Sequence, residues 1–183
     1  MTLTALLASH QPTDEKERAD LAVMRGFATS LERPFARDQW PGHFTGSAVV
    51  VTPDGARVLL VLHAKLNRWL QPGGHADAAD GGSMEVTALR EAREETALDV
   101  ALHPTAPRPL DVDVHVIPAR KSEPEHRHLD VRYLVVAKNP EALAHDPNES
   151  HGAQWLSWKE ALARADEAPL RRLLEKAMRT VLL

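Results

Sequence analysis

Apolar residues recur along this chain at two spacings, one typical of helices and the other typical of strands. In residues 12–31 they return every three or four positions, which predicts an amphipathic helix. Residues 47–51 and 57–62 are short runs rich in Val and Leu, and the turn at 53–55 between them predicts a β-hairpin. The Pro- and Gly-containing stretch 32–42 indicates a linker between this first helix and the first strand.

The remainder of the chain shows the same two patterns. Further strands are predicted at 111–117, 127–135 and 152–156, and further helices at 84–97, with Ser83 as N-cap, 157–165 and 169–182. Helices arranged around a mixed sheet indicate an α/β fold in the form of a sandwich.

A Gly-rich turn precedes the helix predicted at 84–97, and this helix carries a cluster of carboxylates. Gly73-Gly74 lets the backbone approach a ligand closely, because glycine has no side chain. At about 100° per residue, Glu91, Glu94 and Glu95 project within one sector of the helix. A solvated helix face is the alternative for the carboxylates alone, but like charges four residues apart repel unless a cation neutralises them. Oxygen ligands without cysteine suit Mg²⁺ or Mn²⁺ together with substrate phosphates.

The segment from Gly74 to Leu98 resembles the Nudix box, whose pattern is G-x5-E-x7-R-E-U-x-E-E-x-G-U, where U is aliphatic. The matching positions are Gly74, Arg90, Glu91, Ala92, Glu94, Glu95 and Leu98. The loop before Arg90 is two residues longer than the pattern, so Asp77, Asp80 and Glu85 all stay open as replacements for the first Glu. Ala97 stands where the pattern has Gly, which implies mild strain or a different helix end.

The resemblance implies a Nudix-like α/β/α sandwich with a mixed sheet as the catalytic domain, over residues 43–183. Residues 1–42 then form an N-terminal helical extension and linker, which would act as a packing element or a dimer arm.

The resemblance also implies a pyrophosphohydrolase that uses one to three Mg²⁺ or Mn²⁺ ions. The metal ligands carried over are Glu91, Glu94 and Glu95, with the backbone carbonyl of Gly74. Arg90 is implied to orient a helix carboxylate. The general base varies in position within the family; Glu149 is our first choice, and Glu123 and Glu125 are the alternatives.

A second group of polar residues lies on the strand predicted at 127–135. The two-residue period of a strand places His126, His128, Asp130 and Arg132 on one face. We expect His126, His128 and Arg132 to line a substrate-binding wall, with a plain solvated face as the alternative. A dedicated zinc site is disfavoured, because no Cys pattern or further ligand accompanies these residues.

Three more residues fall where a ligand would bind. His43 and His63 lie at strand ends, where pockets form. Lys65 supplies positive charge shortly before the Gly turn and is a candidate for substrate binding, with ordinary surface charge as the alternative.

Composition limits the remaining choices. The length of 183 residues and a hydrophobic share of 43% suit one domain with an extension. The net charge of −4 argues against nucleic-acid binding. The absence of Cys excludes disulfides and thiolate chemistry and fits a cytoplasmic protein. The sequence has no secretory signal pattern and no apolar run long enough for a membrane span.

These observations predict a divalent-metal-dependent hydrolase that cleaves the diphosphate linkage of a nucleoside diphosphate joined to another moiety. One alternative is a nucleotide-sensing Nudix-like module without turnover; another is a metal-dependent enzyme for a non-nucleotide diphosphate. The complete set of Glu91, Glu94 and Glu95 favours catalysis. The expected partner is a small-molecule diphosphate, and a homodimer stays open.

Overall fold

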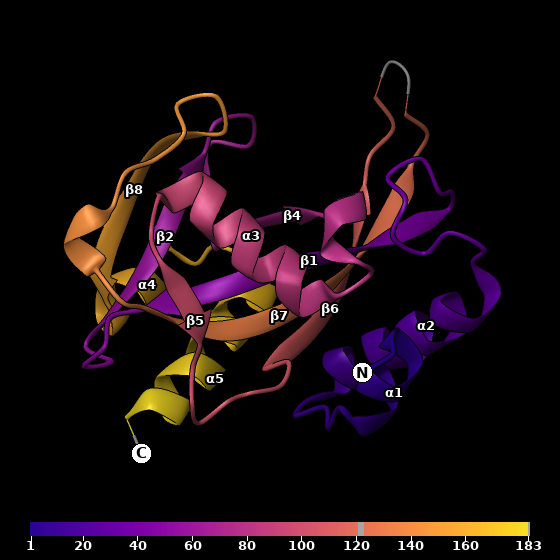
Figure 1. Cartoon of the computed structure of the whole chain (residues 1–183), viewed down its shortest axis with the longest axis horizontal. Helices are drawn as coiled ribbons and strands as arrows, with labels where there is room; N and C mark the ends of the chain where they lie inside the picture. The colour runs from indigo at the N-terminus through magenta and orange to yellow at the C-terminus, as the bar shows by residue number, and fades with distance from the viewer. Residues whose placement is uncertain (121–122, 183) are drawn as a thin grey trace.

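A mixed β-sheet with helices on both faces forms the centre of the computed structural model, which describes residues 1–120 and 123–182 (Figure 1). The strands are β1 (Gly42–Val51), β2 (Arg57–His63), β3 (Arg68–Leu70), β4 (Gly73–His75), β5 (Val100–Leu102), β6 (Asp111–Ile117), β7 (His126–Ala137) and β8 (Ser150–Ser157). The helices are α1 (Leu3–Ser9), α2 (Glu15–Ser30), α3 (Met84–Thr96), α4 (Trp158–Arg164) and α5 (Ala168–Val181), with 3₁₀ turns η1 (Ala78–Asp80) and η2 (Pro140–Ala142).

Strand β1 is the central strand of the sheet. It runs parallel to β7 along its whole length, from Gly42 opposite Arg127 to Val51 opposite Val136. On its other side it pairs with β4 near its start and with β2 only at its end. The predicted hairpin of β1 and β2 is therefore reduced to a short contact, because β4 takes the first half of β1 while β2 pairs with β3 and β8.

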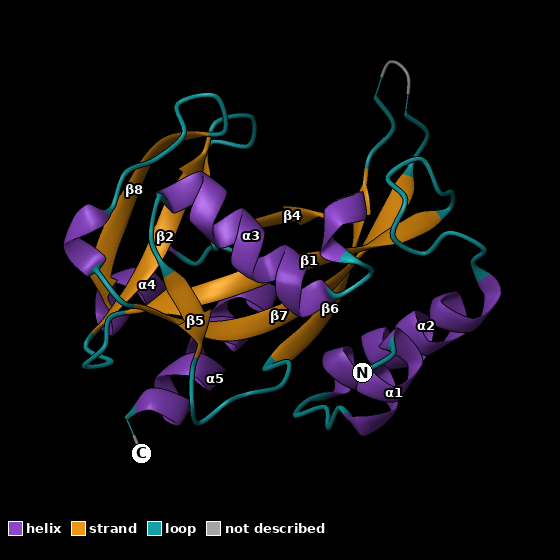
Figure 2. Ribbon diagram, viewed as in Figure 1, coloured by secondary structure: helices purple, strands orange, loops and turns teal. Residues whose placement is uncertain are grey.

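The two faces of the sheet are covered by different helices, as Figure 2 shows. Helix α3 packs on one face, where its Ala88 and Ala92 join Val50 of β1 in a hydrophobic core. Helices α4 and α5 cover the other face, and Leu173 joins Val49 in a second core. Neighbouring residues of β1 thus serve opposite cores, as the alternation of a strand requires. The predicted α/β sandwich is confirmed.

The N-terminal helices α1 and α2 lie side by side at one end of the molecule (Figure 1). Their buried side chains Leu7, Leu21 and Met24 belong to the same hydrophobic core as α3. The extension therefore packs on the sheet through apolar contacts. Helix α1 was not predicted, because its seven residues are too few to show a helical period.

None of the helices within the described residues is long and apolar enough to cross a membrane.

Candidate active site

Helix α3 is fixed at both ends by local interactions. The side chain of Ser83 accepts a hydrogen bond from the backbone N–H of Val86, so the predicted N-cap is confirmed. At the other end Ala97 adopts the left-handed conformation, with φ of 56°, and its N–H donates to the carbonyl of Arg93. The helix therefore ends as the Gly-containing pattern does, although the residue is Ala.

The Gly turn and the carboxylates of α3 are in direct contact. The backbone N–H of Gly73 donates to Oε1 of Glu95 at 2.7 Å. The carboxylate of Glu91 lies against Gly74, where a β-carbon would come within 2.7 Å of it. Glu94, on the same side of the helix, has a side chain that is 59% exposed. Glu91 and Glu95 thus contact the turn, while the Glu94 carboxylate is open to solvent.

Arg90 joins these carboxylates to the loop that precedes α3. Its Nη1 donates to Glu91 at 2.9 Å and to Glu94 at 2.8 Å. Its Nη2 donates to the carbonyl of His75 at 2.8 Å, and its Nε donates to Asp80 at 3.0 Å. The predicted orienting function of Arg90 is consistent with this set of partners.

Of the three residues that the sequence left open as replacements for the first Glu of the box, Asp80 is the one that contacts Arg90. Both of its carboxylate oxygens accept from Arg90 at 3.0 Å, and one also accepts from the hydroxyl of Thr87. Asp77 instead caps the 3₁₀ turn η1. Gly81 and Gly82, which follow Asp80 in the longer loop, both have positive φ values.

The site has an excess of negative charge. Burial raises the pKa of Glu95 to about 8, the Gly73 N–H opposes this rise, and the charges of Glu149 and Glu91 add to it. Burial also raises the pKa of Glu91, although Arg90 opposes the shift. Several carboxylates gathered on one side of α3 offer oxygen ligands, which suit a hard divalent cation. The residues present therefore fit Mg²⁺ or Mn²⁺.

Among the predicted general bases, Glu149 is the one whose charge acts on the carboxylates of α3. It is exposed on the loop before β8, and its charge contributes to the raised pKa of both Glu91 and Glu95. Glu123 instead pairs with Arg37 at 3.3 Å, and Glu125 is exposed on the loop before β7.

The predicted polar face of β7 exists but is not solvated. His126, Asp130 and Arg132 are each 4% exposed. Arg132 donates to Asp130 at 2.8 Å, to Asp113 at 3.1 Å and to Asp111 at 3.3 Å. Its guanidinium is thus fully engaged in a buried ion-pair network, and we no longer assign Arg132 to the substrate wall. His126 is also buried, with Nδ1 donating to the carbonyl of Pro124 at 2.8 Å.

His128 and Lys65 remain accessible. His128 is partly exposed, and Lys65 is exposed on the turn between β2 and β3, where its N–H donates to Nδ1 of His63.

A cluster of histidines that sequence reasoning missed lies beside the Gly turn. His43 of β1, His75 of β4 and His128 of β7 each offer a ring nitrogen, and these atoms all lie within 4.8 Å of one another. Burial, reinforced by neighbouring histidines, lowers the pKa of His75 to about 4 and that of His128 to about 2. The rings of His75 and His128 are therefore neutral at pH 7.

Comparisons with known proteins place this geometry in context. Residues 42–177 match the family model of the NUDIX domain. No curated protein matches the chain closely enough to count as a relative.

Several solved structures share the fold. A crystal structure of a C. elegans Ap4A hydrolase binary complex matches with a TM-score of 0.59 and 20% identity, over 76% of this chain and 97% of that one. A NUDIX-family hydrolase from Clostridium perfringens matches with a TM-score of 0.54 and 25% identity, over 76% and 95%. The dihydroneopterin triphosphate pyrophosphohydrolase of E. coli matches with a TM-score of 0.57 and 16% identity, over 73% and 92%.

Proposed function

We propose that this chain, which belongs to the Nudix family of hydrolases, is a divalent-metal-dependent enzyme that cleaves the diphosphate linkage of a nucleoside diphosphate joined to another moiety. The observation that carries the proposal is the contact between the Gly73-Gly74 turn and the carboxylates of Glu91 and Glu95, with Arg90 joining the helix to the loop.

The carboxylates of Glu91, Glu94 and Glu95 would hold one to three Mg²⁺ or Mn²⁺ ions, with the carbonyl of Gly74 as a further ligand. When bound, such ions neutralise phosphate charge and make a bound water more acidic. Arg90 keeps Glu91 and Glu94 in position through its hydrogen bonds. Because Gly74 has no side chain, the Glu91 carboxylate can lie directly against the backbone of the turn, beside the carbonyl that would share the metal.

The remaining chemistry is the transfer of a proton. Water adds to one phosphorus of the anhydride and the bridging oxygen leaves with the other phosphorus. The attacking water must lose a proton, and we assign its acceptance to the carboxylate of Glu149, which is exposed and whose charge acts on the α3 carboxylates. His128 and Lys65 are our candidates for binding substrate phosphates.

A substrate panel tests this proposal. The full chain is incubated with Mg²⁺ or Mn²⁺ and with nucleotide sugars, ADP-ribose, dinucleoside polyphosphates including Ap4A, dihydroneopterin triphosphate and oxidised nucleoside triphosphates. Released nucleotide and phosphate are measured. We expect turnover of at least one compound, its loss with a chelator and its return with added Mg²⁺.

Glu94→Gln is the variant that tests the site. It removes one carboxylate charge from an exposed side chain, so the fold should persist while the rate falls by orders of magnitude. Glu85→Gln is the matched control, because Glu85 precedes Glu94 by nine residues, which at about 100° per residue places it on the opposite side of the same helix. Activity retained by Glu94→Gln would contradict the site assignment. Micromolar binding of a nucleotide without turnover of any compound would favour the sensing module instead.

A further inference from the structure

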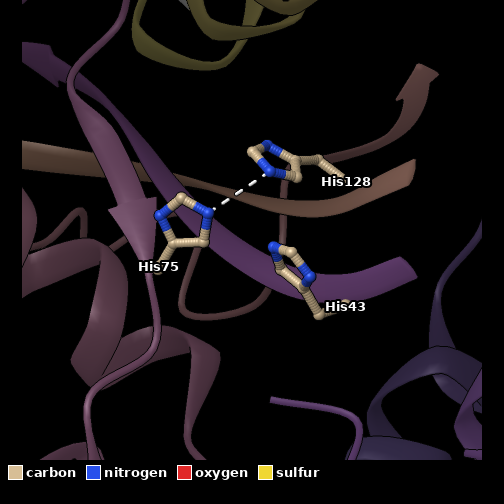
Figure 3. Close-up of side chains that lie close together, drawn as sticks. All are labelled: His43, His75 and His128. Carbon is tan, nitrogen blue, oxygen red and sulfur yellow. Dashed lines mark hydrogen bonds between the residues drawn. The ribbon is translucent and has the colours of Figure 1, made fainter. Parts of the chain in front are cut away.

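Three adjacent strands bring three histidines to one face of the sheet. In the β1–β7 pairing His43 stands opposite His128, and in the β1–β4 pairing His75 stands opposite Thr45, two residues along from His43. Residues two apart on a strand, and residues opposite one another on paired strands, point to the same face. Figure 3 shows the three rings facing one another.

The spacing of two of the ring nitrogens fits metal coordination. Nε2 of His75 and Nε2 of His128 are 3.3 Å apart. Two ligands at the zinc–nitrogen distance of about 2.0–2.1 Å in a tetrahedral site lie about 3.3–3.4 Å from each other. The two rings therefore already have the separation that a shared Zn²⁺ ion requires.

His43 supplies an independent indication. Its side chain is fully buried, and neither of its ring nitrogens has a hydrogen-bond partner among the residues that the structure describes. An unpartnered polar group in the interior is costly, and buried histidines elsewhere in this chain are paired, as His10 is with Glu17. A metal ion that accepts a lone pair from His43 would provide a partner for one of these two nitrogens.

We propose that His43, His75 and His128 bind one Zn²⁺ ion through their ring nitrogens, at a site separate from the glutamate cluster. Neutral imidazole nitrogens without a carboxylate suit Zn²⁺ and not Mg²⁺, which requires oxygen ligands. Three protein ligands leave a fourth tetrahedral position for water or a phosphate oxygen. The His43 ring has to shift toward the other two to complete the site, since the three ligand atoms now spread over as much as 4.8 Å.

The two metal sites would meet at β4 from opposite faces of the sheet. Gly74 contacts Glu91 on the α3 face, and the next residue, His75, points to the other face. The carbonyl of His75 also accepts from Arg90. Zn²⁺ at the three histidines would therefore tie β4 to β1 and β7 and hold in place the turn that positions Glu91, Glu95 and Arg90.

Zn²⁺ binding to the full chain tests the proposal directly. The metal-free protein is titrated with Zn²⁺ in the presence of a large excess of Mg²⁺, which occupies the carboxylates, and bound zinc is counted after dialysis. We expect one equivalent, bound at micromolar concentration or below. His75→Gln should weaken Zn²⁺ binding by at least about 100-fold. Loss of a residue that only orients a metal ligand already lowers metal affinity, and loss of the ligand itself lowers it further.

Two controls separate the histidine site from its surroundings. His115→Gln changes a ring that lies against His128 but is outside the triad, and Glu94→Gln removes a carboxylate of α3. Both variants should still bind one equivalent of Zn²⁺. Loss of zinc from Glu94→Gln with retention in His75→Gln would place the ion at the glutamates and overturn the proposal. No stoichiometric binding by the wild-type chain would overturn it as well.

Spectroscopy with Co²⁺ needs no substitution, so its result does not depend on whether a variant folds. Co²⁺ replaces Zn²⁺ and absorbs visible light strongly in a four-coordinate site but weakly in a six-coordinate oxygen site. We expect the strong absorption with the wild-type chain, and its loss on adding Zn²⁺. A weak six-coordinate spectrum at one equivalent of Co²⁺ would contradict histidine ligation. Zn²⁺ should also raise the melting temperature of the wild type and not that of His75→Gln.

Discussion

The carboxylate of Glu91 occupies the space that a side chain at position 74 would fill: a β-carbon on Gly74 would lie 2.7 Å from its nearest atoms. Gly74 does not have a positive φ, so Ala fits its backbone, and the atoms in the way belong to the flexible end of a side chain. The three atoms nearest to such a β-carbon all belong to the Glu91 carboxylate.

Gly74→Ala should displace this carboxylate and leave the fold intact. We expect at least a tenfold loss of Mg²⁺ affinity and of kcat/KM, with a melting temperature close to that of the wild type. Calorimetric Mg²⁺ titration and thermal unfolding measure the two effects. Gly26→Ala is the control, because a β-carbon there meets nothing within 4 Å, and its activity should be unchanged. Full activity of Gly74→Ala would show that Glu91 need not lie against the turn.

Asp80→Asn should loosen Arg90. Asp80 is buried and accepts from two nitrogens of the guanidinium, so the neutral amide leaves that charge poorly compensated. We expect a loss of about 1.5–3 kcal/mol in the free energy of unfolding and a lower kcat. Chemical denaturation and steady-state kinetics measure these quantities.

The control for Asp80→Asn is Asp99→Asn, whose ion pair with Lys138 at 3.0 Å is exposed. This change should alter stability by no more than about 1 kcal/mol. Equal effects of the two substitutions would mean that Asp80 does not support Arg90.

Ala97→Gly should stabilise the protein. Ala97 has a φ of 56°, and the left-handed conformation costs a non-glycine residue about 1–2 kcal/mol. We expect a gain of about 1 kcal/mol, which corresponds to about 2–4 °C in melting temperature for a domain of this size. Ala163→Gly, at an exposed position inside α4, should have the opposite sign, with a loss of about 1 kcal/mol. A loss of stability in both variants would contradict the strain assigned to Ala97.

The longer helices and strands, and the part of the Nudix box that lies on α3, could be predicted because their residue patterns are local in the sequence. The capped helix α3 and the hydrophobic strands were found from spacing alone. Strand β4 was missed because Gly73-Gly74-His75 has no apolar pattern and is a strand only through its pairing with β1. Asp80 stayed one of three candidates because counting from the two ends of the longer loop gives different positions, and its contact with Arg90 is formed only in the fold.

The remaining differences come from contacts between distant segments. Arg132 was expected to face a substrate, but β6 places Asp111 and Asp113 beside it. The histidine cluster was missed because its members come from three strands, and the pattern on β7 by itself contains neither His43 nor His75. Neither arrangement can be read from one strand, since each depends on the register between strands.

Stability should fall in acid because of Glu17, which joins α2 to α5. Burial by itself raises the pKa of Glu17, but hydrogen bonds from His10 at 2.8 Å and Lys176 at 2.6 Å outweigh it, and the pKa lies well below its usual range. The backbone N–H of Thr13 also donates to it, and Lys176 is shared with Asp111 at 2.7 Å. A carboxylate whose pKa is lower in the folded state stabilises the fold above its unfolded pKa, and this contribution disappears as the pH falls toward the folded pKa.

Glu17→Gln should therefore cost about 3–5 kcal/mol at pH 7, and the difference from the wild type should shrink below about pH 4.3. Denaturation at a series of pH values measures the slope, up to about 1.4 kcal/mol per pH unit for one proton. Glu15→Gln, an exposed position on the same helix, should follow the wild-type curve. A difference that does not change with pH would show that the ionised carboxylate of Glu17 does not contribute.

Glu149→Gln tests the assignment of the general base. The amide has the size of the carboxylate but cannot accept a proton from water, so kcat should fall about 10²–10⁴-fold with little change in KM. Glu141→Gln is the control, because it changes an exposed carboxylate in the same connection between β7 and β8. Mg²⁺ affinity should stay close to the wild-type value in both variants, which separates loss of the base from loss of a metal ligand. If Glu149→Gln retains its kcat, another group accepts the proton of the attacking water. Glu123→Gln and Glu125→Gln are then the variants to measure.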